Sequence, residues 1–376
     1  MKNNYRKLGD YIQPVDVRNS DLKVSHLLGL SIDKCFIESI ANTIGTDFRP
    51  YKIVKKGQFA YGPVTSRNGE KITIALLEEP ECIISSSYAV FEITDTSKLL
   101  PEYLMLWFSR PEFDRYARYK SHGSVREIFD WDEMCRVELP VPDIKEQQKI
   151  VDTYNAITNR IRIKQKINEN LEKTAQCLFE ELTKDKENFE TKTIEEISDA
   201  VICGKTPSTT ESKYWGNEIP FITIPDMHGS NFIHTTERYL SIAGKQSQEK
   251  QTLPKNSICV SCIATVGLVS LTTTESQTNQ QINSIICKEG ISFYYVFMLL
   301  KQMTDELKRL GAGGSTTLNV SKSLFASIKL QLPNEENMNF FDKKVSSLFS
   351  KILINEKEIE KLEALKMTVV SQISKR

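Results

Sequence analysis

Two long segments of the chain place apolar residues at alternating spacings of four and three, which predicts two long helices. A 3.5-residue repeat sustained over about five heptads is typical of a coiled-coil seam. The first seam consists of Ile150, Tyr154, Ile157, Ile161, Lys164, Asn168, Leu171, Ala175, Leu178 and Leu182. Adding 191 to each number gives the second seam, Phe341, Val345, Leu348, Ile352, Asn355, Ile359, Leu362, Lys366, Val369 and Ile373.

Each seam would lie exposed to water if its helix stood alone, so we expect the two helices to pair with each other as an antiparallel coiled coil. With their centres aligned, Asn168 faces Asn355. A buried polar pair of this kind fixes the register of two helices. The sequence leaves open whether these two residues are such a pair or are partly solvated.

The offset of 191 extends beyond the seams. "ELPVP" at 138–142 corresponds to "KLQLP" at 329–333, and the residues that follow, Asp143 and Asn334, are good helix N-caps. Before each cap, short β-branched runs are broken by Gly, Asn and Pro and are followed by one apolar helix. The pattern predicts a duplicated, mixed α/β (α+β) chain, with a domain at 1–143, a helix at 144–190, a second domain at 191–333 and a second helix at 334–376.

The length of the predicted helices suggests what two such domains could do. A helix of about 38 residues spans roughly 57 Å. This exceeds one DNA turn of about 34 Å, the spacing at which two major-groove readers face the same side of the duplex. Two unlike domains held at that separation would recognise a split, asymmetric site.

Composition adds little to this picture. The chain has 376 residues with 49 basic and 49 acidic side chains, so its net charge does not point to a polyanionic partner. No N-terminal signal segment and no run of about 18 apolar residues is present, so we expect a soluble cytoplasmic protein with reduced thiols and no membrane contact. Cys259 and Cys262 have no second Cys or His pair nearby and are predicted to be half-buried strand residues, not zinc ligands.

The sequence shows no catalytic motif. Gly204, Lys205 and Thr206 resemble the end of a phosphate-binding loop, but Asp199 occupies the position of its first glycine and Pro207 follows directly. His228 and His234 are predicted to be surface-loop residues. No nucleotide-binding GxGxxG, metalloprotease HExxH or amino-methyltransferase motif appears. We therefore predict that the chain is not an enzyme.

Three stretches carry a family resemblance that covers essentially the whole chain. They are "GKTPSTTESKYWGNEIPFITIPDM" from Gly204, "LPVPDIKEQQKIV" from Leu139, and "YRKLGDYIQPVDVRN" through "GSVREIFDWDEM" in the first half. The first resembles the opening of a target recognition domain in the specificity subunits of type I restriction-modification systems. The second resembles the end of such a domain, and the third a different subclass of it that lacks the TPS…YW opening.

The resemblance implies a non-catalytic subunit with two target recognition domains, each reading one half of a bipartite site in double-stranded DNA. It implies that the two helices set the half-site spacing and dock two modification subunits, which flip out an adenine and methylate it with S-adenosylmethionine. Restriction subunits with ATP and Mg complete the assembly, and no cofactor is expected in this chain. The alternatives are a similar module of another DNA-modifying or phage-defence assembly, and a coiled-coil scaffold that binds proteins.

Candidate DNA contacts are polar or basic residues in the loops of both domains. In the first domain they are Arg67, Ser86, Tyr88, Ser124 and Arg126, and the run Ser85–Ser87 could instead bond locally within a strand. In the second domain they are Thr206, Ser208, Thr209, Lys213, Tyr214, Ser315, Thr316 and Thr317. We interpret "QTNQQINS" at 277–284 as structural. The second domain has two arginines against nine in the first, so its half-site is expected to depend less on arginine.

Overall fold

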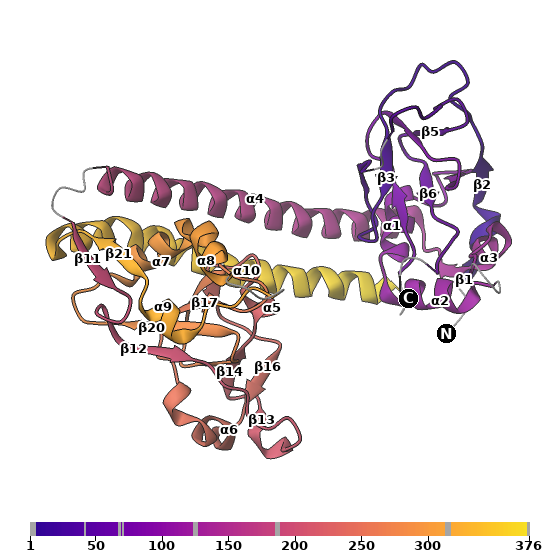
Figure 1. Ribbon diagram of the computed structural model, residues 1–376. Helices are drawn as coiled ribbons and strands as arrows, with labels where there is room; N and C mark the ends of the chain where they lie inside the picture. Colours follow the sequence, from indigo (N-terminus) through magenta and orange to yellow (C-terminus); the bar gives the residue numbers. More distant parts are fainter. Residues whose placement is uncertain are drawn as a thin grey trace. The chain divides into compact units, whose positions relative to one another are not determined.

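The computed structural model describes residues 5–40, 43–66, 69, 71–122, 127–184, 189–312 and 317–373. The chain divides into two compact units, one of Met1–Ile161 with Leu362–Arg376 and one of Arg162–Lys361. Two long helices, α4 (Ile144–Leu182) and α10 (Glu335–Gln372), each contribute to both units (Figure 1).

The centre of the first unit is a four-stranded antiparallel sheet with the order β2-β9-β6-β7. In its register Ile12 pairs with Ile93, and Phe59 pairs with both Phe91 and Leu76. Phe59 and Phe91 are fully buried and stack at 4.9 Å, so they lie in the core. The strands are β2 (Ile12–Val15), β6 (Phe59–Tyr61), β7 (Ile74–Leu76) and β9 (Ala89–Ile93).

Three further strand pairs complete the first unit. β1 (Tyr5–Lys7) pairs antiparallel with β10 (Glu138–Pro140), which brings the start of the domain beside the strand that leads into α4. The other two pairs form a lobe around a small apolar cluster that includes Leu28, Val54 and Ile84. The lobe strands are β3 (Leu28–Leu30), β4 (Phe36–Glu38), β5 (Lys52–Lys55) and β8 (Glu81–Ile84).

The apolar stretch "PEYLMLWFSRPEFDRYARY" from Pro101, which the sequence pattern predicts as one helix, forms two, α1 (Pro101–Phe108) and α2 (Pro111–Lys120). The prediction of a single helix was wrong because a residue before proline is disfavoured in the helical region. Arg110 accordingly has extended backbone angles, φ −80° and ψ 138°. A short helix, α3 (Trp131–Arg136), and a 3-10 turn at Leu8–Asp10 complete the unit.

The second unit repeats this plan. Its main sheet has the order β12-β20-β17-β18-β15, in which the first four strands correspond to β2, β9, β6 and β7, and β15 adds a parallel edge. β11 (Glu190–Thr193) pairs antiparallel with β21 (Lys329–Leu332) just before α10, as β1 pairs with β10 before α4. The sheet strands are β12 (Ser198–Cys203), β15 (Phe232–Ile233), β17 (Ile258–Ser261), β18 (Val269–Thr272) and β20 (Ile282–Cys287).

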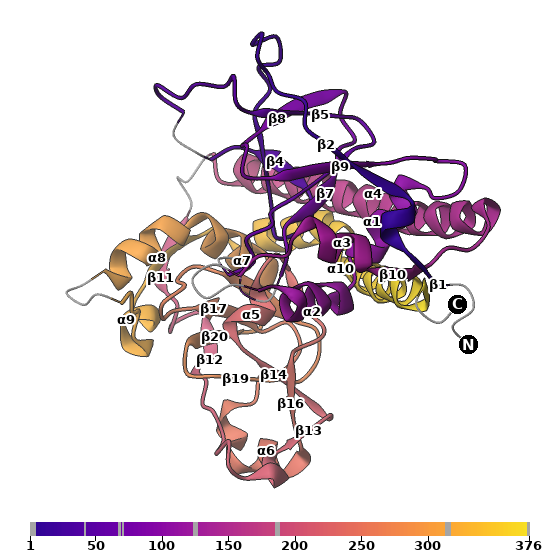
Figure 2. The same ribbon diagram turned by 90° about the vertical axis from the view of Figure 1, so that its right-hand side faces the viewer.

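A second sheet, with the order β13-β16-β14-β19, forms the lobe of this unit. Figure 2 shows this lobe at the bottom, with α6 at the end far from α7. Its strands are β13 (Trp215–Gly216), β14 (Ile219–Ile222), β16 (Arg238–Leu240) and β19 (Gln277–Thr278). Short helical segments lie between them, namely Ser212–Tyr214, α5 (Ile224–Met227), α6 (Ile242–Ser247) and Glu249–Gln251.

The second apolar stretch also forms two helices, α7 (Phe293–Gln302) and α8 (Thr304–Gly311), which meet at Met303. There the chain turns without a proline, since Met303 has φ −83° and ψ 9°. α9 (Lys322–Ala326) follows and corresponds to α3. Tyr295, Phe297 and Leu300 of α7 are fully buried with Phe349 of α10 in the largest apolar cluster of the unit.

The two long helices begin where the sequence predicts. Asp143 accepts a hydrogen bond from the backbone N–H of Glu146 at 3.0 Å, and Asn334 accepts one from Asn337 at 2.9 Å, which confirms both N-caps. Within the second unit Asn168 faces Asn355, and Phe179 contacts Phe341 at 5.9 Å between ring centroids. A residue further along α4 therefore contacts a residue earlier in α10, so the two helices run antiparallel here.

The seam positions of both helices are buried or half-buried. The buried ones named by the sequence pattern include Ile150, Ile157, Ile161, Phe341, Val345 and Ile352, and the half-buried ones include Tyr154, Leu171, Leu178, Leu348, Ile359, Leu362 and Val369. Asn355 is fully buried, and its Nδ2 donates to Asn168 Oδ1 at 2.8 Å. Lys164 donates to Asn355 Oδ1 at 3.1 Å and pairs with Glu358 at 2.7 Å. A polar cluster thus interrupts the apolar seam at its middle.

The fold is that of two mixed α/β domains and two long helices that pack antiparallel along an apolar seam. Among the described residues, no helix is long and apolar enough to cross a membrane.

Candidate nucleic-acid interface

The Gly204–Thr206 segment lies at the end of β12 and is tied to the neighbouring strands by its own amides. The N–H of Gly204 donates to Ile282 O at 3.1 Å, and the N–H of Lys205 donates to Thr278 O at 2.9 Å. A Cβ at position 204 would lie 2.2 Å from Thr278 Oγ1, so only glycine fits. A phosphate-binding loop needs such amides free. This segment therefore positions the side chains that follow it.

Three other segments meet the Gly204–Thr206 segment at this end of the sheet. Thr206 Oγ1 donates to Gln280 Oε1 at 2.7 Å, and the N–H of Cys262 donates to Gln281 O at 2.8 Å. The N–H of Ala264 donates to Leu318 O at 3.0 Å, which joins the segment around Leu318 to the segment that contains Cys262 and Ala264. Residues far apart in the sequence are thereby fixed as one surface.

We call this surface the polar face, and its residues are Lys205, Thr206, Thr265, Gln280, Thr317, Asn319 and Lys322. Thr206 is half-buried and the others are exposed. The segments that supply them, 203–206, 262–265, 279–281 and 317–322, contain no Asp or Glu. Lys, Gln, Asn and Thr side chains are the types that contact phosphates and base edges. The polar face is the best candidate for a nucleic-acid interface in this domain.

Cys262 lies in one of the segments that supply the polar face, and Cys259 lies on the strand before it. Burial raises the pKa of the nearby Cys259 thiol to about 12 and that of Cys262 to about 11, so neither is a ready nucleophile. In the described part of the chain, no three His, Cys, Asp or Glu residues are grouped so as to hold a metal ion. What the polar face can do is form hydrogen bonds and ion pairs.

Cys259 and Cys262 are more deeply buried than the half-buried positions predicted. Both are at most 1% exposed, because β17 is an inner strand whose two faces are covered. Cys259 faces one apolar cluster and Cys262 the other.

The other candidates of the second domain lie around the start of its lobe. Ser208 and Thr209 are exposed, and Ser208 O accepts a hydrogen bond from the Trp215 indole at 3.2 Å. Lys213 is exposed, pairs with Glu211 at 3.3 Å and lies 5.1 Å from the ring centre of the half-buried Tyr214. Ser315 and Thr316 lie outside the described residues.

The glutamine-rich segment 277–284 has two roles in the structure. Gln277, Thr278, Asn279, Asn283 and Ser284 are buried, which fits the structural interpretation. Gln280 differs because it is exposed at the turn between β19 and β20. Gln280, Thr265, Asn319 and Lys322 could not be predicted from the sequence, since only the folded sheet places them beside Thr206.

In the first domain, Arg67, Ser124 and Arg126 lie outside the described residues. Ser86 is exposed in a turn where Ser85 Oγ and Ser87 Oγ are 3.0 Å apart, which is the local bonding considered for this run. Tyr88 is half-buried against the lobe cluster. An aromatic residue not selected from the sequence, Tyr119, is 80% exposed near the end of α2.

Most of the described arginines in the first domain pair with a carboxylate or are buried. Arg18, Arg49, Arg115, Arg118 and Arg136 each pair with a carboxylate. Arg110 is 5% exposed and stacks on Trp107 at 4.2 Å. For the described residues, the larger number of arginines in the first domain thus corresponds mainly to arginines that pair with carboxylates or are buried.

His234 is not the surface-loop residue predicted. It is half-buried, and its Nε2 lies 3.0 Å from Glu360 Oε2 of α10. The sequence could not show this pairing, because the two residues are far apart in the chain. His228 is exposed, as predicted.

Comparisons with known proteins agree on one family. The family model of the type I restriction modification DNA specificity domain matches residues 39–173 and 186–364. The HindI type I restriction enzyme specificity subunit of Haemophilus influenzae is 31% identical over 84% of this chain and 85% of its own length. The MjaIX type I restriction enzyme specificity subunit of Methanocaldococcus jannaschii is 30% identical over 46% of this chain and 40% of its own length.

A solved structure has the same fold. The S subunit of a type I restriction-modification system from M. genitalium matches with a TM-score of 0.64 and 14% identity, over 98% of this chain and 95% of that one. The family matched is one of DNA-recognition proteins, not of catalytic subunits. The duplicated fold and the matches over both repeats place the chain in the family of type I restriction-modification DNA specificity subunits.

Proposed function

We propose that each of the two domains reads one half of a bipartite, asymmetric site in double-stranded DNA. The observation that carries this proposal is the duplication with divergence. Both domains share four antiparallel strands of the central sheet and the strand pair that precedes the long helix, but the strands of their lobes pair differently. A common framework with unlike lobes is suited to recognising two unlike sequences at two equivalent positions.

The polar face supports the proposal for the second domain. Lys205 and Lys322 would contact phosphates, while Gln280, Asn319 and Thr206 would reach base edges. The other candidates in the loops, from Ser208 to Tyr214 and at Ser315–Thr317, would extend this surface. In the first domain the contacts would come from the regions around Arg67, Ser86, Tyr88 and Ser124–Arg126.

The long helices would set the distance between the half-sites. α4 has 39 residues, which at about 1.5 Å per residue gives roughly 58 Å. This exceeds a DNA turn of about 34 Å, so two readers held by the helices could engage separate half-sites. The buried Asn168–Asn355 bond supports this role because it fixes the register of the pair.

Two equivalent grooves support the docking of two copies of one partner, the modification subunit. One groove, of about 230 Å³, is lined by Leu178, Glu181, Leu182, Asn337, Phe340, Phe341 and Lys344. The other, of about 90 Å³, is lined by Val369, Gln372, Ile373, Glu146, Lys149, Ile150 and Thr153. Each residue of one differs by 191 from a residue of the other. A partner subunit that binds one groove could therefore bind the other groove as well, so that one chain would bind two copies of the partner.

The chemistry of the complete assembly would reside in the partners. The modification subunits would use S-adenosylmethionine to methylate an adenine flipped out of the duplex. Restriction subunits would supply ATP and Mg dependent cleavage. This chain would bring them to the site in the cytoplasm without a cofactor of its own.

The test is to co-express the chain with the modification subunit encoded beside its gene and to map methylated adenines across the host genome by single-molecule sequencing. Each protein expressed alone is the control. We expect methylation at one split motif with two unlike halves, dependent on both proteins. A stable complex that methylates nothing would contradict the proposal.

A further inference from the structure

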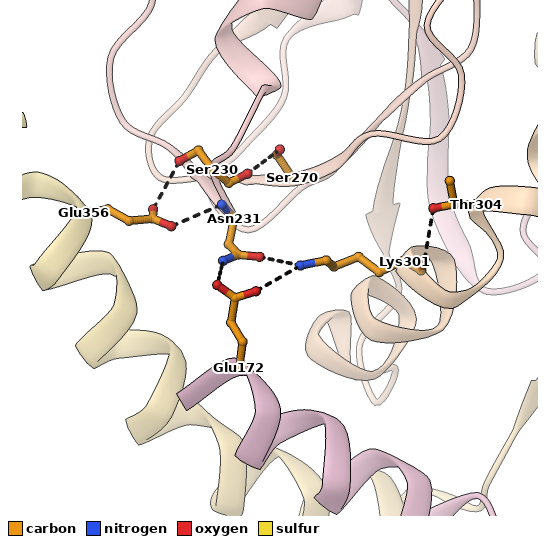
Figure 3. A network of polar contacts seen from close by, with 7 residues as sticks. All are labelled: Glu172, Ser230, Asn231, Ser270, Lys301, Thr304 and Glu356. Atoms are coloured by element: carbon orange, nitrogen blue, oxygen red, sulfur yellow. Dashed lines mark hydrogen bonds and ion pairs between the residues drawn. The ribbon is translucent and has the colours of Figure 1, made fainter. Parts of the chain in front are cut away.

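A turn of the second domain, Ser230–Asn231, is held by carboxylates from both long helices (Figure 3). The backbone N–H of Asn231 donates to Glu356 Oε1 at 3.2 Å, and Ser230 Oγ donates to Glu356 Oε2 at 3.2 Å. The Asn231 side chain reaches the other helix, where its Nδ2 donates to Glu172 Oε1 at 2.9 Å. One turn thus contacts α10 and α4 at the same time.

A third element joins the same group. Lys301 of α7 donates through Nζ to Asn231 Oδ1 at 2.7 Å and lies 3.5 Å from Glu172 Oε2. The turn itself is held to the main sheet, because Ser270 Oγ donates to Ser230 O at 2.9 Å. The Asn231 amide, 5% exposed, uses its donor toward one helix and its acceptor toward α7. If the Asn231 amide were flipped, its NH₂ group would face the Lys301 ammonium and its oxygen would face the Glu172 carboxylate, and both contacts would be unfavourable.

These polar contacts constrain geometry in a way that the apolar contacts beside them do not. Phe232 packs edge-on against Phe349 at 6.2 Å, and burial of apolar area is non-directional. Hydrogen bonds weaken steeply when distance or angle departs from the optimum. Burial also raises the pKa of Glu356, because the carboxylate loses part of its hydration here. A costly buried polar group can be retained because it specifies one geometry.

The surroundings make a direct contact of these residues with DNA unfavourable. Glu172, Ser230 and Glu356 border a hollow of about 640 Å³ that is also lined by Glu169, Asp226, Glu237 and Glu360. Among the described residues lining it, none is Lys or Arg. A phosphate backbone would be repelled from this side of the domain.

The first domain contacts its long helix through different residues. The residues 191 earlier than Lys301 and Asn231 are Arg110 and Ile40. Arg110 stacks on Trp107, and Ile40 is 97% exposed. The first domain is instead tied to α4 by the buried Gln147, which accepts a hydrogen bond from the Leu100 N–H at 2.9 Å and donates to Lys98 O at 2.8 Å.

From this we infer that Glu172, Asn231, Lys301 and Glu356 are positioning residues, which hold the second domain in one orientation on the helices and thereby restrict the assembly to one spacer length between half-sites. The inference rests on the proposed function, since it concerns the geometry of bipartite reading. It assigns to these residues no part in the choice of bases.

The test is a charge swap between the two partners on the turn and on α4. Asn231→Asp places a carboxylate against that of Glu172, whereas the double variant Asn231→Asp with Glu172→Gln restores one donor and one acceptor. Glu169→Gln is the matched control, because Glu169 also lies on α4 beside the hollow but pairs with Lys166 of its own helix. Each chain is co-expressed with the modification subunit, and methylated motifs are mapped.

We expect Asn231→Asp to lower methylation at the wild-type spacer at least about tenfold relative to sites one base pair longer or shorter, which corresponds to about 1.4 kcal/mol. The bases of both halves should not change, the double variant should restore the wild-type spacer, and Glu169→Gln should behave as wild type. Should Asn231→Asp fail to fold, Glu172→Gln alone decides, because it removes only the ion pair with Lys301. It should shift the spacer preference in the same direction by a smaller factor.

The inference is overturned if Asn231→Asp, or in its place Glu172→Gln, retains the wild-type spacer preference, or if either variant changes the bases read. Loss of thermal stability without a change in spacer would equally assign these residues a merely structural role. The proposed function fails separately, because in that case the wild-type chain itself yields no split motif.

Discussion

The two domains have the same central sheet, yet the surfaces built on it differ in chemistry. Ser321 and Asp130 are separated by 191 and cap the corresponding helices α9 and α3. Ser321 lies in the segment 317–322, which contains no carboxylate. The corresponding residues 127–132 of the first domain include Glu127, Asp130 and Asp132. Equivalent positions in a duplicated fold therefore need not have equivalent electrostatics.

The lobes extend this difference. In both domains three lobe strands lie between the first strand of the main sheet and its inner strand, β6 or β17, and one lobe strand, β8 or β19, follows β7 or β18. The first lobe contains two strand pairs, and the second contains a four-stranded sheet with α5 and α6. The two domains thus differ mainly in their lobes. The strand pairs that precede the long helices, β1 with β10 and β11 with β21, are alike in both domains. The framework can thus be kept while the surface used for reading is replaced.

The largest effect is expected from Gly204→Val, since a side chain at this position would overlap Thr278 and the backbone of Asn279. Overpacking of this kind costs about 1–3 kcal/mol or more, and the polar face would lose its arrangement. We expect methylation of the split site to be lost, while the purified chain retains the long-helix signal in circular dichroism.

Gly29→Ala is the matched control in the first domain, because a Cβ at this position would have no atom within 4 Å of it. Methylation should persist in that variant. Equal loss in both would show that glycine replacement is harmful in general and would not support a specific role of the Gly204 segment.

The two grooves predict the next largest effect. Phe340 is 58% exposed in the larger groove, and the equivalent position of the other groove is Lys149. Phe340→Lys should weaken the binding of one modification subunit by about 10- to 100-fold, because burial of a Phe side chain contributes about 1.5–3 kcal/mol.

Native mass spectrometry over a concentration series measures this effect directly. We expect complexes with one modification subunit to accumulate for Phe340→Lys, and Lys149→Phe to favour complexes with two. An unchanged stoichiometry in both variants would mean that the partner does not use these grooves.

The buried asparagine pair predicts an effect on stability. Asn168→Leu leaves Asn355 Nδ2 without its acceptor in a fully buried position, which costs about 1–3 kcal/mol. Urea unfolding should show this loss. The double variant Asn168→Leu with Asn355→Leu should lose less than the sum of the two single variants, and additive losses would contradict a direct interaction.

A smaller effect tests the electrostatic difference between the domains. Ser321→Asp keeps a good N-cap but adds to the polar face the charge that the first domain has at Asp130. DNA affinity, measured by fluorescence anisotropy at low salt, should fall by about 1 kcal/mol, or roughly fivefold. The difference should vanish at high salt, and Asp130→Ser should have less effect. A salt-independent loss would indicate a folding defect.

The smallest effect is a pH dependence. Burial raises the pKa of Glu356 above its ordinary value of 4.5. The folded state therefore binds a proton more readily than the unfolded state, so this group's contribution to stability is complete below about pH 4.5 and is lost as the pH rises through the folded pKa. Glu356→Gln should remove this slope. Thermal melting between pH 4 and pH 8 checks it, and an identical slope in both proteins would contradict the assignment.

The sequence predicted the elements that depend on local patterns. The 4,3 spacing of Ile150 to Ile161 and the caps at Asp143 and Asn334 are local signals, and the structure contains both. The break before Pro111 could also have been predicted, because proline disfavours the helical conformation of the residue before it. The continuous apolar pattern on both sides of Pro111 led instead to the prediction of one helix. The break at Met303 has no such signal.

Features that depend on chain topology were not predictable. Gln280, Asn319 and Lys322 lie beside Thr206 only because β12, β17 and β20 are neighbours in the sheet. His234 was misplaced for the same reason, since its partner Glu360 lies on α10. The offset of 191 relates positions of the two repeats in the sequence. It does not predict how deeply the side chain at either position is buried.

The central claim is that the two domains read separate halves of one site. The most direct measurement is the methylation map of a chimera in which residues 191–333 are replaced by the corresponding region of the HindI specificity subunit. We predict a split motif with one half and the spacer unchanged and the other half new. A motif that changes in both halves, or one that does not change at all, would contradict the account.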